Sequence, residues 1–115
     1  NIVLKSEGTQ YFSYSYVFDV VSALLYILFY GKKGEAYNIA DETCDIRLNH
    51  LAQILADLAG TKVIFELPDE AESRGFSKAT TARLNPEKLK GLGWSTVGTM
   101  EEKLEKTVRL LQAKI

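Results

Sequence analysis

The sequence predicts a small α/β fold of about three short strands and four helices. Two observations carry this prediction. Apolar and polar residues alternate over residues 11–18 with the period of two that is typical of a half-buried strand. Later segments repeat their apolar residues with the period of a helix. A chain of 115 residues is expected to form one domain.

The first predicted elements are a strand, a helix and a second strand. Residues 11–18 form the first strand, and Asp19 suits a helix N-cap, because its carboxylate can accept the free backbone N–H groups of the first turn. The helix over residues 20–30 is expected to end at Gly31 in a left-handed conformation. It is apolar on nearly every side, so it should be covered on several sides. A second strand is predicted at residues 36–39.

The middle of the chain predicts a helix, a strand and a loop. Leucine and alanine recur at helical spacing over residues 48–59 and stop at Gly60, and residues 61–67 predict a strand. Residues 69–81 hold mixed charges and hydroxyl groups with no clear period, which indicates a loop.

Two further helices are predicted near the end of the sequence. Asn85 suits an N-cap with Pro86 at the first helical position, and the glycines that follow should end this short helix. Thr99 and Glu102 form a capping box before the last helix. Its apolar stripe consists of Met100, Leu104, Val108, Leu111 and Ile115.

The motifs from residue 8 onward resemble those of a known family. Residues 8–19 have the sequence Gly-Thr-Gln-Tyr-Phe-Ser-Tyr-Ser-Tyr-Val-Phe-Asp, and Tyr37-Asn38 follow the predicted helix. This order resembles the C-terminal half of the extended short-chain dehydrogenase/reductases, specifically the nucleotide-sugar epimerases and dehydratases. In that family the frame is Gly-x-Gln-x-Arg-x-aromatic-x-Tyr-Val-x-Asp. Phe12 departs from it, because the family has there an arginine that pairs with the substrate diphosphate.

The resemblance continues through Lys88-Leu89 and Leu92-Gly93-Trp94 to the last helix. It implies that residues 1–115 are the C-terminal, substrate-binding lobe of an NAD(P)-binding Rossmann-type enzyme. The parent would be an NAD-dependent isomerase of carbohydrate metabolism that oxidises a sugar hydroxyl to a keto-sugar and reduces it again. Its N-terminal lobe, a nucleotide-sugar substrate, a homodimeric state and a cytoplasmic location are implied with it.

The chemistry of that family is not encoded in these residues. No Gly-x-x-Gly-x-x-Gly turn is present to hold the NAD pyrophosphate, and none of the six tyrosines has a lysine four positions later. The sequence also starts at Asn1 without a methionine. We therefore interpret the chain as a fragment that binds substrate, and alone we expect neither catalysis nor a cofactor site.

Four residues are candidates for substrate binding. By resemblance, Asn38 contacts the substrate nucleotide, although an asparagine at a strand end can equally cap the next turn. Gln10 is a weaker candidate, since a polar residue beside a glycine turn needs no ligand. Arg74 lies where the family often places a second diphosphate-binding arginine, and Arg83 is another candidate for this role. As an isolated loop residue, Arg74 could also be simply solvated.

Other classes of function find little support. A net charge of −1 does not indicate a positively charged surface that would bind nucleic acid or an anionic membrane. The apolar run of residues 20–30 is about half of the roughly 20 residues that a transmembrane helix needs. His50 has no second histidine beside it, so we expect neither a metal nor base chemistry. Cys44 is the only cysteine, which excludes an internal disulfide.

Two alternatives to an epimerase remain open. A 4,6-dehydratase or a decarboxylase of the same family differs by acids located outside these residues. A non-catalytic nucleotide-sugar-binding or scaffold protein of the same fold is the second alternative, and Phe12 in place of the family arginine favours it.

Overall fold

The computed structural model describes residues 1–75 and 79–113. The strands within these residues are β1 (Ile2–Leu4), β2 (Tyr11–Ser13), β3 (Asp45–Arg47), β4 (Val63–Phe65) and β5 (Thr81–Ala82). The helices are α1 (Val17–Tyr30), α2 (Leu48–Ala59), α3 (Glu70–Ser73), α4 (Glu87–Lys90) and α5 (Met100–Ala113), with a 3₁₀ turn at Glu42–Cys44. None of these helices is long and apolar enough to cross a membrane.

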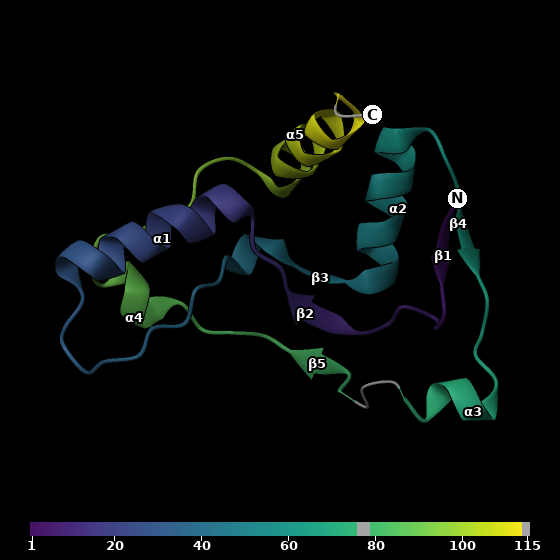
Figure 1. Cartoon of the computed structure of the whole chain (residues 1–115), viewed down its shortest axis with the longest axis horizontal. Helices are drawn as coiled ribbons and strands as arrows, with labels where there is room; N and C mark the ends of the chain where they lie inside the picture. Colours follow the sequence, from purple (N-terminus) through teal and green to yellow (C-terminus); the bar gives the residue numbers. More distant parts are fainter. Residues whose placement is uncertain (76–78, 114–115) are drawn as a thin grey trace.

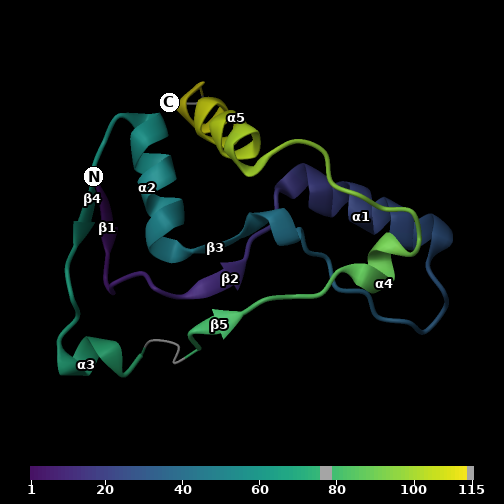
Figure 2. The same ribbon diagram turned by 180° about the vertical axis from the view of Figure 1, so that it is seen from behind.

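The strands form two small sheets. β1 and β4 pair in parallel, and β2 lies between β3, its antiparallel neighbour, and β5, its parallel neighbour. Figure 1 shows α1 and α4 at one end of the molecule and α2 with the β1–β4 pair at the other, and the reverse view in Figure 2 agrees. The chain is therefore extended, with principal dimensions of 47 × 35 × 22 Å.

One face of α1 packs on the segment around α4. Ala23 is fully buried there against Leu89 and Trp94. The indole Nε1 of Trp94 donates a hydrogen bond of 3.0 Å to Oγ of Ser22, so the buried indole N–H has an acceptor. This contact forms a hydrophobic core that the half-buried Tyr26, Ile27, Tyr37, Ile39 and Leu92 complete.

The other faces of α1 are exposed. One face of α1 packs on the α4 segment, and the described residues do not supply the further cover that a helix apolar on nearly every side is expected to need. Leu28 and Phe29 are 74% and 72% exposed. The exposed apolar side chains of the helix are Val17, Phe18, Val21, Leu24, Leu25, Leu28, Phe29 and Tyr30. We call these eight side chains the open face of α1.

The boundary between β2 and α1 differs from the sequence prediction. The strand ends at Ser13, and Val17 and Phe18 belong to the helix. Asp19 is not the N-cap, which is Tyr16. The Asp19 carboxylate is directed instead to the ammonium group of Lys103, 2.7 Å away, an ion pair that a local pattern does not reveal.

The end of α1 also differs. Gly31 is extended, with φ −68° and ψ 150°, and not left-handed. Its N–H still donates to the carbonyl of Ile27, and the next N–H, that of Lys32, donates to the hydroxyl of Tyr37. The chain thus leaves the helix without a left-handed turn.

The predicted strand at residues 36–39 does not form. Its residues carry no strand assignment, and no described strand pairs with them. A strand needs a neighbour for its backbone groups, and a periodic pattern cannot supply one. Conversely, the pattern missed β1 and β3, which are three residues each.

The second half of the chain follows the prediction more closely. α2 ends at Ala59, and Gly60 is left-handed with φ 68°. β4 lies within the predicted strand at residues 61–67. The predicted loop over residues 69–81 contains α3 and the start of β5. Residues 76–78 of this loop lie outside the described residues, as does Ile115 of the apolar stripe predicted for the last helix.

The two predicted capping residues accept the expected kind of hydrogen bond. Oδ1 of Asn85 accepts from the N–H of Glu87 at 2.9 Å at the start of α4, although the N-cap position itself is Pro86. Oγ1 of Thr99 accepts from the N–H of Glu102 at 3.2 Å at the start of α5. Local capping residues therefore predicted where both helices start.

Candidate substrate-binding site

An open groove of about 530 Å³ lies beside β5 and α4. A groove of this size is within the range of small-molecule sites. The amide Nδ2 of Asn38 donates to the backbone carbonyl of Asn85, a lining residue, at 3.4 Å. Arg83 therefore lines the groove, and Asn38 contacts the backbone of a residue that lines it. Its lining consists of Glu42, Asp45, Thr81, Ala82, Arg83, Leu84, Asn85, Pro86 and Glu87.

The charges of this groove are unevenly distributed. Glu42 lies 2.6 Å from the ammonium group of Lys90, and Glu87 lies 3.8 Å from it. The carboxylate of Asp45 accepts a hydrogen bond of 2.8 Å from the hydroxyl of Ser13. Since the acids already have partners, the guanidinium of Arg83 is the group at this groove that suits an added anion.

Arg83 contacts an aromatic ring together with a second arginine. Its guanidinium carbon lies 5.2 Å from the ring centroid of Tyr11, and that of Arg47 lies 5.6 Å from the same centroid. Sequence reasoning missed Arg47. The strand β3 that carries it is too short to show a period, so no local signal was present.

Phe12 lies on the opposite face of the sheet from Tyr11. It pairs with Ile46 across β2 and β3, and the side chain of Ile46 is buried. Directly paired residues project to the same face, and successive residues to opposite faces. Phe12 therefore faces the interior side of the sheet.

The structure does not bring Gln10 and Arg74 to the groove. Nε2 of Gln10 donates to Oγ of Ser6 at 3.3 Å, and its Oε1 is buried with no hydrogen-bond partner among the described residues. Arg74 is exposed at the end of α3, 3.7 Å from Glu70 of the same helix. Figure 1 shows α3 at the end of the molecule distant from α4. The binding roles of all four candidates stay predictions.

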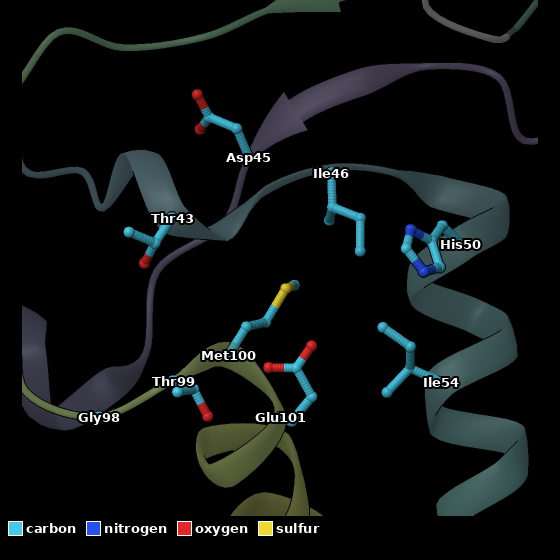
Figure 3. A pocket seen from close by; sticks show the side chains of 9 residues that line it. All are labelled: Thr43, Asp45, Ile46, His50, Ile54, Gly98, Thr99, Met100 and Glu101. Carbon is cyan, nitrogen blue, oxygen red and sulfur yellow. The ribbon is translucent and has the colours of Figure 1, made fainter.

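A second hollow, of about 380 Å³, lies between β3, α2 and the start of α5. Figure 3 shows Ile46, Ile54 and Met100 pointing into it, with the carboxylate of Glu101 between Met100 and Ile54 and His50 beside the hollow. Asp45 points away from this hollow in the same view. Its lining thus combines aliphatic side chains with the carboxylate of Glu101, and His50 is exposed on the first turn of α2.

A buried network of charges holds three segments together. Nζ of Lys103 on α5 lies 2.7 Å from Oδ2 of Asp19 on α1 and 2.8 Å from Oδ2 of Asp41 before the 3₁₀ turn. Burial raises the pKa of Asp41, but hydrogen bonds from Lys103 and Thr43 outweigh it and hold that pKa well below its ordinary value. Burial lowers the pKa of Lys103, and its two carboxylate partners raise it to a net value above the ordinary one.

Cys44 joins this network. Its thiol donates to Oδ2 of Asp41 at 3.4 Å. Burial, followed by the negative charge of Asp41, raises the pKa of the Cys44 thiol to about 11. The thiol is therefore protonated near neutral pH and acts as a structural donor.

Comparison with known proteins relates the chain to one group of enzymes. No family model matches it. It is 33% identical over 110 residues to the trifunctional UDP-glucose 4,6-dehydratase/UDP-4-keto-6-deoxy-D-glucose 3,5-epimerase/UDP-4-keto-L-rhamnose reductase of Arabidopsis thaliana. This match covers 91% of the chain and 15% of the Arabidopsis protein.

Solved structures give the same result. The UDP-glucose 4-epimerase of Thermotoga maritima with UDP-glucose superposes with a TM-score of 0.82 at 25% identity, over 99% of this chain and 35% of the epimerase. The dTDP-glucose 4,6-dehydratase of Bacillus anthracis in complex with NAD superposes with a TM-score of 0.81 at 22% identity, over 96% of this chain and 34% of that chain. The chain thus spans well under half the length of these proteins.

The relatives in sequence and the neighbours in structure agree on an α/β fold that is part of a Rossmann-type enzyme. Over nearly its whole length the chain is similar to nucleotide-sugar epimerases and dehydratases, and it spans only a part of each of them.

Proposed function

We propose that residues 1–115 are the substrate-binding, C-terminal portion of an NAD-dependent nucleotide-sugar epimerase. The observation that carries the proposal is that Arg83 lines the groove while Asn38 donates a hydrogen bond to the carbonyl of Asn85, another lining residue. An amide can select a nucleobase or a sugar hydroxyl, and a guanidinium suits a diphosphate. The similarity to an epimerase solved with UDP-glucose supports this choice of ligand.

The redox step is assigned to the rest of the enzyme. The chain contains neither a pyrophosphate-binding glycine turn nor a Tyr-x-x-x-Lys pair. In the complete enzyme, bound NAD would supply the hydride transfer, in which the hydride leaves the carbon that bears a sugar hydroxyl and is later returned. The residues described here would hold the nucleotide end of the substrate and keep the sugar in place for that step.

The open face of α1 is the proposed contact with the N-terminal lobe. Eight exposed apolar side chains on one helix exceed what a soluble protein normally leaves in water, and such patches mark contacts with other protein surfaces. The extended residues 36–39 follow α1 and have no strand neighbour among the described residues. Both features suit docking on a further lobe, in a parent that we expect to be dimeric and cytoplasmic.

A 4,6-dehydratase is the second candidate function. The observation that favours it is the name of the Arabidopsis relative, which includes UDP-glucose 4,6-dehydratase activity. Both activities begin with the same oxidation, so the residues described here would serve either. Product analysis separates them, since an epimerase returns an isomer of the substrate and a dehydratase releases water.

The test uses the full-length protein with several nucleoside diphosphates and their sugar conjugates. We expect binding of a nucleotide sugar that Asn38→Ala weakens, that Arg83→Ala weakens at least tenfold, and that Phe12→Arg leaves unchanged or tightens. Gln53→Ala, a change of an exposed amide on α2, is the matched control for Asn38→Ala. If no nucleotide sugar binds, the substrate-lobe assignment fails and the scaffold alternative gains support.

A separate titration tests whether the cofactor site lies outside these 115 residues. We expect the 115-residue chain to show no NAD binding by calorimetry, because it has no pyrophosphate turn. A micromolar NAD site in this chain would contradict the assignment of the cofactor to another lobe.

A further inference from the structure

The chain around Asn38, residues 35–42, is held in place by side chains and not by strand pairing. No backbone–backbone hydrogen bond joins residues 36–40 to another described residue. The side chain of Asn38 is exposed, and its hydrogen bond to the carbonyl of Asn85 is 3.4 Å long, which is longer than usual for an N–H···O bond. The position of the Asn38 amide therefore depends on the contacts that its neighbours in this segment make.

The ion pairs of this segment differ in burial. Its exposed ion pairs to α4 are Glu35–Lys88 and Glu42–Lys90. All four of these side chains are about half-exposed, and ion pairs of this kind hold a segment only weakly. The pair of Asp41 with Lys103 is different, because both of its side chains are 5% exposed. Among the described residues, Lys103 therefore supplies the buried ionic contact of this segment.

The carboxylate of Asp41 is held through both of its oxygens. Oδ1 accepts from the N–H and the hydroxyl of Thr43 at 3.0 and 2.6 Å, and Oδ2 accepts from the ammonium group of Lys103 at 2.8 Å. Ala40, the residue before Asp41, is 1% exposed. Because only two residues separate Asp41 from Asn38, a shift of the Asp41 carboxylate would also move Asn38.

We propose that Lys103 is a positioning residue, which holds Asp41 and through it places the amide of Asn38 at the groove. Lys103 is not among the residues that line this groove, so it acts there through Asn38. That the amide then contacts a nucleotide sugar rests on the proposed function. The placement of Asn38 by Lys103 does not, and it can be measured without any ligand.

A second acid of the same network separates this role from a general contribution to stability. The ammonium group of Lys103 also lies 2.7 Å from Oδ2 of Asp19, which belongs to α1. Asp41→Asn and Asp19→Asn each remove one negative charge from the network, and each leaves Lys103 with one carboxylate partner. Both variants should therefore fold, but only Asp41→Asn releases the segment that carries Asn38.

The first measurement is the affinity of the full-length protein for UDP-glucose and for dTDP-glucose. Asp41→Asn should weaken binding by about five- to tenfold, as expected when a hydrogen bond to the ligand is lost, and Asp19→Asn by less than about twofold. Asn38→Ala should weaken binding further in Asp19→Asn but very little in Asp41→Asn, because there the two substitutions remove the same contact. Lys103→Arg, which keeps the charge, should retain more of the affinity than Lys103→Met.

The second measurement needs no ligand. In full-length protein with isotopically labelled asparagine, the side-chain amide signal of Asn38 is identified by its absence from the Asn38→Ala spectrum. This signal should shift or broaden in Asp41→Asn and in Lys103→Met, and it should stay in place in Asp19→Asn. Should Lys103→Met unfold, the comparison of Asp41→Asn with Asp19→Asn decides the question.

The outcomes distinguish this inference from the proposed function. An Asn38 signal that is unchanged in Asp41→Asn overturns the positioning role, whatever the protein binds. Equal losses of affinity in Asp41→Asn and Asp19→Asn also overturn it, because they assign the network a general structural role. A signal that moves in Asp41→Asn but not in Asp19→Asn, in a protein that binds no nucleotide sugar, supports the positioning by Lys103 and defeats the proposed function.

Discussion

The ammonium group of Lys103 lies 2.8 Å from Oδ2 of Asp41 in the interior of the protein, where both side chains are 5% exposed. Oδ2 of Asp19 lies 2.7 Å from the same ammonium group. The three residues come from α5, from the segment that follows Asn38, and from α1. This network fixes the position of α1, and it also fixes the chain three residues after a candidate substrate-binding residue.

Removal of Lys103 is expected to be strongly destabilising. Lys103→Met leaves two carboxylates buried without a cation, and breaking a buried charge network in this way costs about 3–5 kcal/mol. The free energy of unfolding from urea titration measures the effect, with Trp94 as the fluorescent probe. Lys106→Met is the matched control, because Lys106 is an exposed lysine of the same helix. Equal unfolding free energies for the two variants would show that the network contributes little.

The pKa of Asp41 predicts a loss of stability in acid. The folded-state pKa lies below the ordinary value of 3.8, so the stabilising contribution is fully present above about pH 4 and disappears as the pH falls. Thermal unfolding between pH 2 and pH 7 should therefore show a smaller pH dependence for Asp41→Asn than for the wild type. Asp57→Asn, at an exposed site on α2, should keep the wild-type slope. Parallel curves for wild type and Asp41→Asn would contradict this prediction.

The raised pKa of Lys103 predicts a loss of stability at alkaline pH. Its contribution is fully present below about pH 10.5 and is lost as the pH rises through the folded-state value. Taken together, the two shifts predict a broad plateau of stability between weakly acidic and weakly alkaline pH. A pronounced stability maximum near neutral pH in the wild type would be inconsistent with this network.

Cys44 is expected to react slowly with thiol reagents in the folded protein. Its side chain is 4% exposed, and its pKa of about 11 keeps the thiolate fraction low at pH 8. The rate of modification by a disulfide reagent should increase by at least tenfold in urea, where burial is lost. Rapid labelling under native conditions would show that the segment around the 3₁₀ turn opens readily.

Local sequence predicted those elements whose ends depend on local contacts. The helix that stops at Gly60 and the helix that starts after Thr99 depend on capping groups a few residues away, and both were readable. The missing strand at residues 36–39 depends on a neighbour that a periodic pattern does not contain. Asp19 was misplaced for a related reason, since its partner Lys103 is far away in the sequence.

The candidate site likewise combines residues that the sequence identified with contacts that depend on distant segments. Asn38 and Arg83 were named in advance, but sequence spacing gave no reason to expect both at one groove. Arg47 was missed because its contact with the ring of Tyr11 depends on the pairing of β2 with β3. The pattern of the last helix did not single out Lys103, whose buried position depends on two acids contributed by other segments.

The open face of α1 leads to the last prediction. Leu28 and Phe29 are its most exposed side chains, so the isolated 115-residue chain should bind apolar dyes and self-associate. The double substitution Leu28→Ser and Phe29→Ser should reduce both effects without lowering stability, because neither side chain belongs to the core around Trp94. Leu67→Ser, which replaces an equally apolar and exposed residue beyond β4, should change neither.

In the full-length protein the same double substitution should have the opposite consequence. If the open face packs on another lobe, each lost side chain removes about 1.5–3 kcal/mol of burial, and the thermal unfolding temperature should fall. Dye binding and sedimentation velocity of both chain lengths provide the comparison. If the 115-residue chain is monomeric and binds no dye, the open face of α1 does not require contact with another protein surface. If the thermal unfolding temperature of the full-length protein does not change with Leu28→Ser and Phe29→Ser, its additional lobe docks on a different surface.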